Sequence, residues 1–295
     1  MAITAAMVKE LREKTGLGMM DCKKALNEAD GNMDLAIENL RKKGQATAAK
    51  RAGKSAKEGT VVSFVEGDKA VMFEINCETD FVSGSDDFTG YIANLTAALK
   101  ANIPTSLSEV LSTPMGDTTI GEVTTDLMGK IGEKVTIPSY EVQSIAAGEM
   151  VYPYVHNNGK VGALVKLTSD NNDVLTSDAV KQLGVDLAMQ VAASAPQAID
   201  ETGLDAAYLA KEKEIFLEQL KNEGKPEAMA EKIVIGKMNK LYKTVTLVNQ
   251  EFIKADKVSV AKHIASVAKE AGATLAISSI YRVELGALDT GSDED

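Results

Sequence analysis

The chain is poor in histidine and cysteine, two residue types that often act as bases, nucleophiles or metal ligands. The 295 residues include two histidines, His156 and His263, and two cysteines, Cys22 and Cys77. The histidines cannot form an HExxH zinc motif, which needs two of them four positions apart on one helix. The cysteines form no CxxC pair, and so sparse a set is typical of a reducing cytoplasm. An enzyme built on a nucleophile–base pair is therefore disfavoured.

Two other segments resemble ligand-binding loops only in part. Gly53-Lys54-Ser55 matches the end of a phosphate-binding loop, but Ala48 stands where the first glycine is required. Asp170, Asp173 and Asp178 suggest a calcium loop, yet its central Gly and terminal Glu are missing. Since neither pattern is complete, we expect no metal site and no cofactor.

An aromatic residue in a loop is the stronger functional candidate. A well-patterned strand ends at Cys77, and polar residues then lead into the bulky pair Phe81-Val82. On one interpretation Thr79 or Asp80 caps the next helix and Phe81 packs inward as a staple. On the other, Phe81 is presented as an anchor, the residue type that dominates binding energy at interfaces. The pattern alone leaves both open.

The composition argues against nucleic acid and membranes as partners. The chain has 32 basic and 43 acidic side chains, a net charge of −11, which repels phosphate. Aromatic residues make up 4% and Trp is absent, so a base-stacking platform has few candidate residues. The chain shows neither a signal peptide nor an apolar run of about 18 residues, so we expect a soluble cytoplasmic protein.

The elements that position these residues begin with an N-terminal three-helix domain of the ubiquitin-associated (UBA) type, expected at 1–45. Its clearest helix follows the N-cap Asn32, with apolar residues at helical spacing: Met33, Ala36, Ile37 and Leu40. A basic linker follows at 46–58. The segment 41–57 has seven basic residues and no acid, so the charge is divided unevenly between the two parts of the chain.

From residue 59 one strand–turn–strand–helix pattern occurs twice. The first copy runs to about 101 and the second covers 148–193, roughly 90 residues later, which indicates an internal duplication. Because each copy has too few strands to be stable alone, we expect two packed α+β subdomains, 59–145 and 146–287.

An antiparallel helical hairpin is expected as an insertion at 205–243. Gly224-Lys225-Pro226 stops one amphipathic helix and starts the next. The other faces are dense in Lys and Glu, so the hairpin should protrude. The acidic tail at 288–295 is expected to be disordered. The predicted fold class is therefore α+β, with a UBA-like bundle, two duplicated subdomains and an inserted hairpin.

Two segments resemble the signature motifs of the bacterial translation elongation factor Ts family. They are LREKTGLGMMDCKKAL at Leu11–Leu26 and EINCETDFV at Glu74–Val82, in order and at the expected spacing. The second motif departs from the family where Ser83-Gly84 replaces a basic or Asn residue. Weaker matches extend the resemblance over nearly the whole chain: His156 with Gly159 and Gly162, Ala188–Pro196 and Gly236–Lys240.

The resemblance implies a guanine nucleotide exchange factor that makes and breaks no covalent bond. Its partner would be elongation factor Tu, bound first with GDP and then free of nucleotide. Asp80 and Phe81, with Thr79 and Val82, would enter the nucleotide-binding domain of Tu beside the magnesium and phosphate site. The resemblance implies further contacts from this chain. Arg12, Met19, Met20 and Lys23 would contact that same domain of Tu, and His156 would contact its distal domain.

A second interpretation stays open. The chain could be a passive adaptor or chaperone that docks through the UBA-type domain and forms a homodimer through the helical hairpin. Nucleotide dependence separates the two, because an exchange factor must bind its GTPase best without nucleotide.

Overall fold

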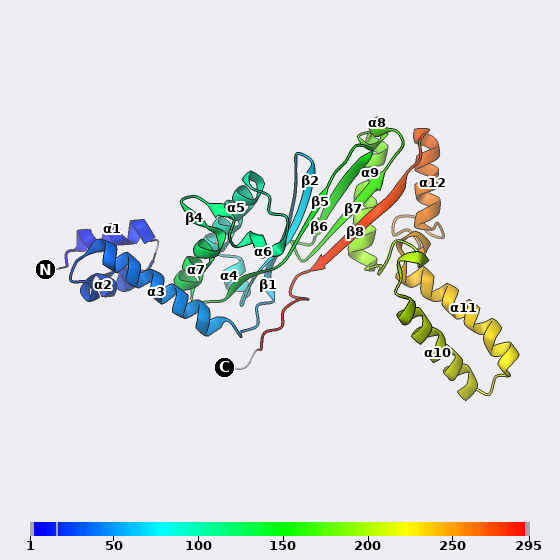
Figure 1. The fold of residues 1–295 in the computed structure, drawn as a ribbon, viewed down its shortest axis with the longest axis horizontal. Coiled ribbons are helices and arrows are strands. Elements are labelled where there is room, and N and C mark those ends of the chain that lie inside the picture. The colour runs from blue at the N-terminus through cyan, green and yellow to red at the C-terminus, as the bar shows by residue number, and fades with distance from the viewer. Residues whose placement is uncertain (1–2, 16, 293–295) are drawn as a thin grey trace.

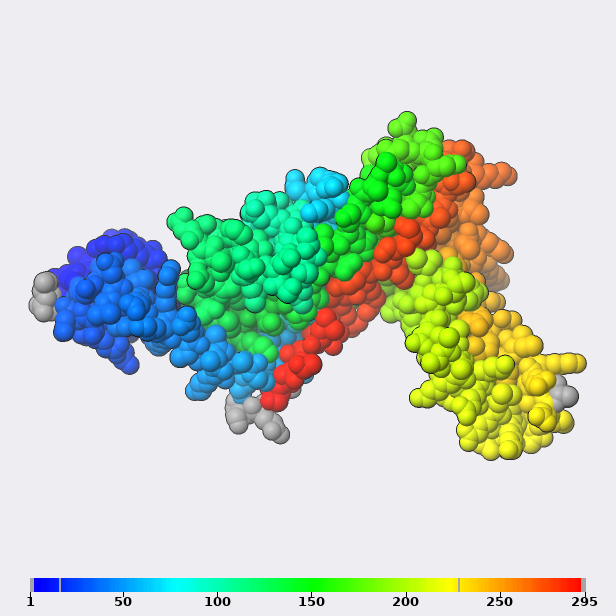
Figure 2. Space-filling view, in the orientation of Figure 1, coloured from blue at the N-terminus to red at the C-terminus, as the bar shows by residue number. Residues whose placement is uncertain are grey.

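A helical domain, two α+β subdomains and a helical hairpin follow one another along an elongated molecule (Figure 1). The structure, a computed structural model, describes residues 3–15 and 17–292. The helical domain lies at one end, and the hairpin projects from the second subdomain (Figure 2). The α+β class predicted from the sequence is confirmed.

The N-terminal domain is a bundle of three helices, α1 (Ala5–Thr15), α2 (Met19–Glu28) and α3 (Met33–Arg51). Asn32 caps α3 as expected, because its side chain accepts a hydrogen bond of 3.1 Å from the Leu35 N–H. Helix α3 continues to Arg51, so the first part of the predicted linker is helical. The three-helix arrangement agrees with the UBA-type domain, which stays a prediction. The bundle core comprises Val8, Leu11, Cys22, Ala25, Leu26, Ala29, Ala36 and Leu40.

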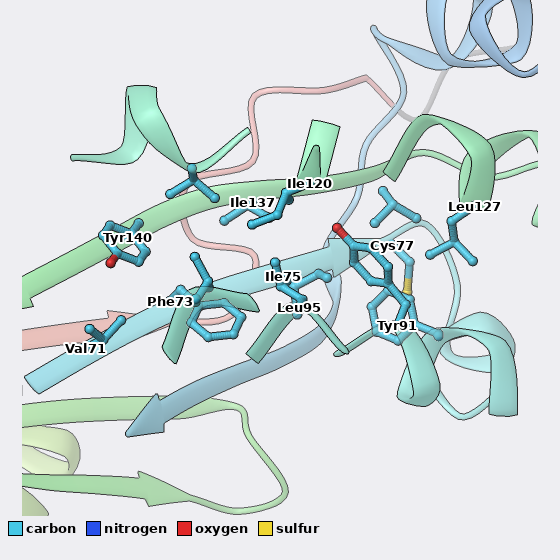
Figure 3. Packing of buried hydrophobic residues seen from close by; sticks show 14 of the residues in the cluster. Val71, Phe73, Ile75, Cys77, Tyr91, Leu95, Ile120, Leu127, Ile137 and Tyr140 are labelled. Atoms are coloured by element: carbon cyan, nitrogen blue, oxygen red, sulfur yellow. The ribbon is translucent and has the colours of Figure 1, made fainter. Parts of the chain in front are cut away.

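The first subdomain contains an antiparallel sheet in the order β1-β2-β5. Its core lies between this sheet and two helices, α5 and α7, and Figure 3 shows Phe73 and Ile75 near Leu95, and Tyr91 beside Cys77. Its elements in chain order are β1 (Glu58–Glu66), β2 (Lys69–Cys77), α4 (Asp80–Ser83), α5 (Asp86–Ala101), α6 (Leu107–Val110), β3 (Pro114–Met115), β4 (Thr118–Thr119), α7 (Ile120–Ile131) and β5 (Val135–Ser144).

The second subdomain repeats this plan with a sheet in the order β6-β7-β8. In each subdomain a β-hairpin is followed by a long helix. A third strand, later in the chain, then pairs with the second strand of the hairpin. The elements are β6 (Glu149–His156), β7 (Val161–Thr168), α8 (Asn172–Leu175), α9 (Asp178–Ser194), α12 (Val260–Ala271) and β8 (Ala276–Glu284).

The two sheets pack against each other through one mixed apolar cluster. Alternate residues of a strand face opposite sides, so β2 directs Phe73 and Ile75 into its own core and Ala70 and Met72 toward the second sheet. Gly162 permits this approach, because a Cβ there would lie 2.6 Å from Met72 Sδ. The cluster comprises Val61, Ala70, Met72, Val151, Leu164 and Val283.

The helical hairpin consists of α10 (Ala206–Asn222) and α11 (Glu227–Val245) and has only a small core of its own. Two short 3₁₀ turns flank it, Glu201–Gly203 and Leu247–Asn249. Its root is fixed to the body, since Ala198 and Thr246 form a parallel bridge and the buried Gln190 amide donates a 3.0 Å hydrogen bond to Gln250. The hairpin is thus joined to the body at its root.

Besides the helical first part of the linker, two features differ from the sequence-based expectations. Strand β5 was not predicted, because Pro138 interrupts its apolar alternation; a bulge opposite Ile75 accommodates this residue, which has no N–H to donate. The tail was expected to be disordered at 288–295, but residues 288–292 lie along the linker, where Ser55 Oγ donates a 2.7 Å hydrogen bond to Asp289. Residues 293–295 lie outside the described part of the chain.

Candidate partner-binding surface

Phe81 is the most exposed large apolar side chain of the described residues, with 87% of its surface accessible. It belongs to the short helix α4. We call this helix and the residues that flank it, 79–84, the Phe81 turn. Thr79 caps this helix by accepting a hydrogen bond of 3.4 Å from the Val82 N–H. Val82 packs against the core of the first subdomain. The predicted cap is therefore present, but Phe81 points outward instead of acting as a staple.

The Phe81 turn is held by a reciprocal clamp between two dipeptides, Glu78-Thr79 and Glu133-Lys134. The Glu133 carboxylate accepts hydrogen bonds of 3.0 Å from the Thr79 N–H and 2.7 Å from the Thr79 hydroxyl. In return, the Glu78 carboxylate accepts a 2.6 Å hydrogen bond from the Lys134 N–H. Its other oxygen accepts a 2.9 Å hydrogen bond from Arg51 at the end of α3. The turn is thus tied both to the segment that follows α7 and to the bundle's long helix.

Cys77 closes strand β2 immediately before the clamp. Its side chain is fully buried, and Sγ donates to the Thr79 carbonyl at 3.3 Å. Burial, together with the negative charges of Glu133 and Glu58, raises the pKa of Cys77 to about 12. A neutral thiol in this position packs as a small apolar group and is not a nucleophile.

A second exposed group lies on the bundle. Met20 and Met19 have 74% and 49% of their surfaces accessible, and both belong to the first turn of α2. Lys23 follows one helical turn later on the same exposed side, and Arg12 is exposed on α1. We call these four residues the bundle patch. Flexible methionines and long cationic side chains adapt well to a protein surface.

The bundle patch and the Phe81 turn are separate surfaces on one framework. Between them runs the 19-residue α3, about 28 Å long at about 1.5 Å per residue. Helix α3 crosses α7 at two glycines, and a Cβ on Gly129 would lie 2.7 Å from the Gly44 Cα. The contact leaves no room for side chains, so it fixes where the bundle sits on the first subdomain.

His156 forms a third location, at the end of β6. Its Nδ1 lies 2.7 Å from the hydroxyl of Tyr154, and the ring is exposed. The turn that follows packs on the first sheet, where the Val61 N–H donates a 2.7 Å hydrogen bond to the Gly159 carbonyl. Gly159 and Gly162, which belonged to a weaker motif match, are therefore packing residues between the sheets.

The predicted site residues thus lie in three separate groups and do not converge on one pocket; Thr79 and Val82 are half-buried, and the other members are exposed. Four residues of the clamp and its support were not predicted as site residues: Glu78, Glu133, Lys134 and Arg51. Glu78 lies inside the second motif, so its position was visible in the sequence. Glu133 is 54 residues from Thr79 and carries no local pattern that would connect it to the turn.

Other kinds of site receive no support from the described residues. Within 3–15 and 17–292, no group of three or more His, Cys, Asp or Glu side chains is arranged to hold a metal ion. Among the helices described, none combines the length and the apolar character needed to cross a membrane.

The fold and these surfaces define an α+β protein that presents an isolated aromatic side chain and two exposed methionines at separate places, residue types that are enriched in protein interfaces. The family model for elongation factor Ts matches residues 78–287. Proteins named elongation factor Ts align over nearly the whole chain. The protein from Clostridium kluyveri is 42% identical over 99% of this chain and 96% of its own length. The one from Nitratiruptor is 42% identical over 100% and 97%, and that from Clostridium perfringens 40% over 96% and 93%. The chain belongs to the elongation factor Ts family.

Proposed function

We propose that this protein is a guanine nucleotide exchange factor for elongation factor Tu and acts during translation elongation in the cytoplasm. The observation that carries the proposal is Phe81, whose side chain is 87% exposed although its turn is held by the clamp. A large apolar side chain exposed to water on a fixed support is suited to enter a partner. Membership of the elongation factor Ts family supports the choice of partner.

The proposed mechanism is a competition between two ligands of Tu. If this protein lowers the affinity of Tu for GDP by some ratio, GDP lowers the affinity of Tu for this protein by the same ratio. Phe81 enters beside the magnesium and phosphate site, and the exposed carboxylate of Asp80 brings a negative charge to the same place. A negative charge there opposes phosphate and attracts the magnesium ion away from it.

Phe81 alone is too small to account for a large effect. Each tenfold loss of nucleotide affinity requires about 1.4 kcal/mol. Burying one Phe supplies roughly 1.5–3 kcal/mol, so Phe81 accounts for one or two powers of ten. The bundle patch and His156 would supply further binding energy to hold the turn in place, the former on the nucleotide-binding domain of Tu and the latter on its distal domain.

The decisive experiment is the release of fluorescent GDP from purified elongation factor Tu with and without this protein. We expect catalytic amounts of the protein to accelerate release, and the complex to be most stable without nucleotide. Equal binding to Tu with and without GDP, or no acceleration, would favour the adaptor interpretation instead. No covalent product should form in either case.

The adaptor interpretation retains one supporting observation, the apolar surface of the helical hairpin. Ile235 and Met229 have 64% and 52% of their surfaces accessible, and a groove between α10 and α11 is lined by Leu209, Leu217, Val234 and Tyr242 among others. A second copy of the chain could cover this surface. Sedimentation of the wild-type protein and of Ile235→Glu tests the homodimer, and it does so independently of GDP release.

A further inference from the structure

The Phe81 turn has little stability of its own. Helix α4 has four residues, which is a single turn, and isolated helices of this length do not form in water. Its cap bond from Val82 to Thr79 is 3.4 Å long, and Phe81 itself makes almost no contact with the rest of the protein. The direction in which Phe81 leaves the surface must therefore be set by something outside the turn.

Glu133 meets this requirement by its two hydrogen bonds to Thr79. Both are shorter than the cap bond, at 3.0 and 2.7 Å, and bonds to a carboxylate are about twice as strong as neutral ones. Together they engage the N–H and the hydroxyl of one residue, so they fix the peptide plane as well as the side chain. Phe81 lies only two positions further along.

Glu133 is itself rigidly placed. Helix α7 ends at Ile131, and Gly132 reverses the chain in the left-handed region with φ of 78°, donating its N–H to the Met128 carbonyl. Leu127 anchors the helix in the core. The next residue after Glu133 is Lys134, whose N–H completes the clamp on Glu78. Glu133 therefore transmits the position of α7 to the turn.

We infer that Glu133 is a positioning residue for Phe81: its hydrogen bonds to Thr79 hold the turn in the orientation in which Phe81 enters a partner protein. The inference rests on the proposed function for its consequence, but its physical content concerns the free protein. An ordered turn has less conformational freedom to lose on binding. Removing the Glu133 side chain should therefore weaken the action of Phe81, although Glu133 itself makes no contact with the partner in this account.

The absence of Trp from the chain permits a direct test in the free protein. Phe81→Trp places the only indole fluorophore of the protein on the turn. We expect its time-resolved anisotropy to gain a fast local component when Glu133→Ala is added, and a smaller one with Glu133→Gln, whose single amide oxygen can accept only one of the two hydrogen bonds from Thr79. Glu122→Ala, an exposed acid at the opposite end of α7, is the matched control and should leave the anisotropy unchanged.

The outcomes are distinguishable. Unchanged local motion of the introduced indole in a folded Glu133→Ala protein would overturn the inference. If Glu133→Ala fails to melt cooperatively, Glu133→Gln carries the test, and unchanged motion of the indole in that variant overturns the inference equally. Because no partner is present, these results do not depend on whether the protein acts on elongation factor Tu.

A double-mutant cycle on GDP release tests the consequence. Glu133→Ala should reduce the acceleration about three- to tenfold in the wild-type background. It should cause no further loss in the Phe81→Ala background, because the side chain that it positions is then missing. Equal losses in both backgrounds would show that Glu133 acts by another route. If the wild-type protein accelerates nothing, the proposed function fails while the anisotropy result still decides the positioning.

Discussion

Gly44 of α3 and Gly129 of α7 are in backbone contact, so close that a Cβ on Gly129 would lie 2.7 Å from the Gly44 Cα. Two helices from different domains meet here with no side chain between them. The close contact fixes where α3 crosses α7. It therefore also fixes the position of the bundle patch relative to the first subdomain. This contact makes the relative position of the bundle and the Phe81 turn a testable property.

Gly129→Ala should disturb that position. A methyl group at this crossing forces the helices apart and should cost about 1–3 kcal/mol of stability, or loosen the bundle from α7. We expect faster amide exchange in α3 and weaker acceleration of GDP release. Gly90→Ala is the matched control, since Gly90 lies in α5 with open space around its Cα and should be neutral or slightly stabilising. Identical behaviour of the two variants would contradict this account.

Phe81→Ala should reduce function without reducing stability. A buried Phe replaced by Ala typically costs about 3–5 kcal/mol, but Phe81 is 87% exposed, so the urea midpoint should stay close to that of the wild type. The acceleration of GDP release should fall by about one or two powers of ten. Both quantities should be measured on one preparation. Strong destabilisation would mean that Phe81 packs inward in solution.

Replacing residues 207–242 by a short Gly-Ser link should leave the body folded. The hairpin buries little apolar surface, and the bridge between Ala198 and Thr246 remains in place. Thermal melting should shift little, and most of the exchange activity should persist. By contrast, Gln190→Ala leaves the buried Gln250 amide without this partner and should destabilise the body by about 1–3 kcal/mol. Loss of exchange in a folded, monomeric deletion would instead assign the hairpin a contact with Tu.

The C-terminal residues should protect the linker. Ser292 pairs with Lys54, and Ser55 donates to Asp289. Burial opposes ionisation of Asp289, but hydrogen bonds from Ser55 and from the Ala56 and Gly291 backbones outweigh it and lower its pKa. Truncation after Ala287 should therefore speed tryptic cleavage at Lys54 and Lys57 with little change in the melting of the body. Asp289→Ala should act in the same direction, whereas Asp256→Ala, the same charge change at an exposed position, should not.

Stability should decline in alkali from about pH 9. Cys77 ionises near its ordinary pKa of 9.0 when unfolded but near 12 when folded, so between these values the unfolded state alone loses a proton. Loss of a proton from the unfolded state favours unfolding as the pH rises. Burial likewise raises the pKa of Tyr91 and Tyr152 to about 12, which adds to the effect above an ordinary tyrosine pKa of 10.0. Urea midpoints measured at intervals from about pH 8 to about pH 10.5 check this, and Cys77→Ala should flatten the first part of the decline.

Local signals allowed much of this fold to be predicted. Asn32 and Thr79 act as caps because capping depends on residues within three positions, and the hairpin turns follow from Gly67 and Gly159 in the left-handed region. Strand β5 was missed since its partner β2 lies far away in sequence and Pro138 disguises the alternation. The exposure of Phe81 could not be decided either. The turn that carries Phe81 is held by Glu133, a long-range contact that no local pattern contains.

The bridge between Ala198 and Thr246 also bears on how fast the chain can fold. Strand β7 ends at Thr168 and its partner β8 begins at Ala276. This connection is far longer than the one between β2 and β5 in the first sheet, which runs from Cys77 to Val135. Loop-closure entropy makes such long connections slower to form. If the helical hairpin forms first and brings Ala198 next to Thr246, the connection that remains to be closed has about 60 residues, close to that of the first sheet. The insertion then slows the folding of the second sheet little, because its residues no longer add to the length of the loop between β7 and β8.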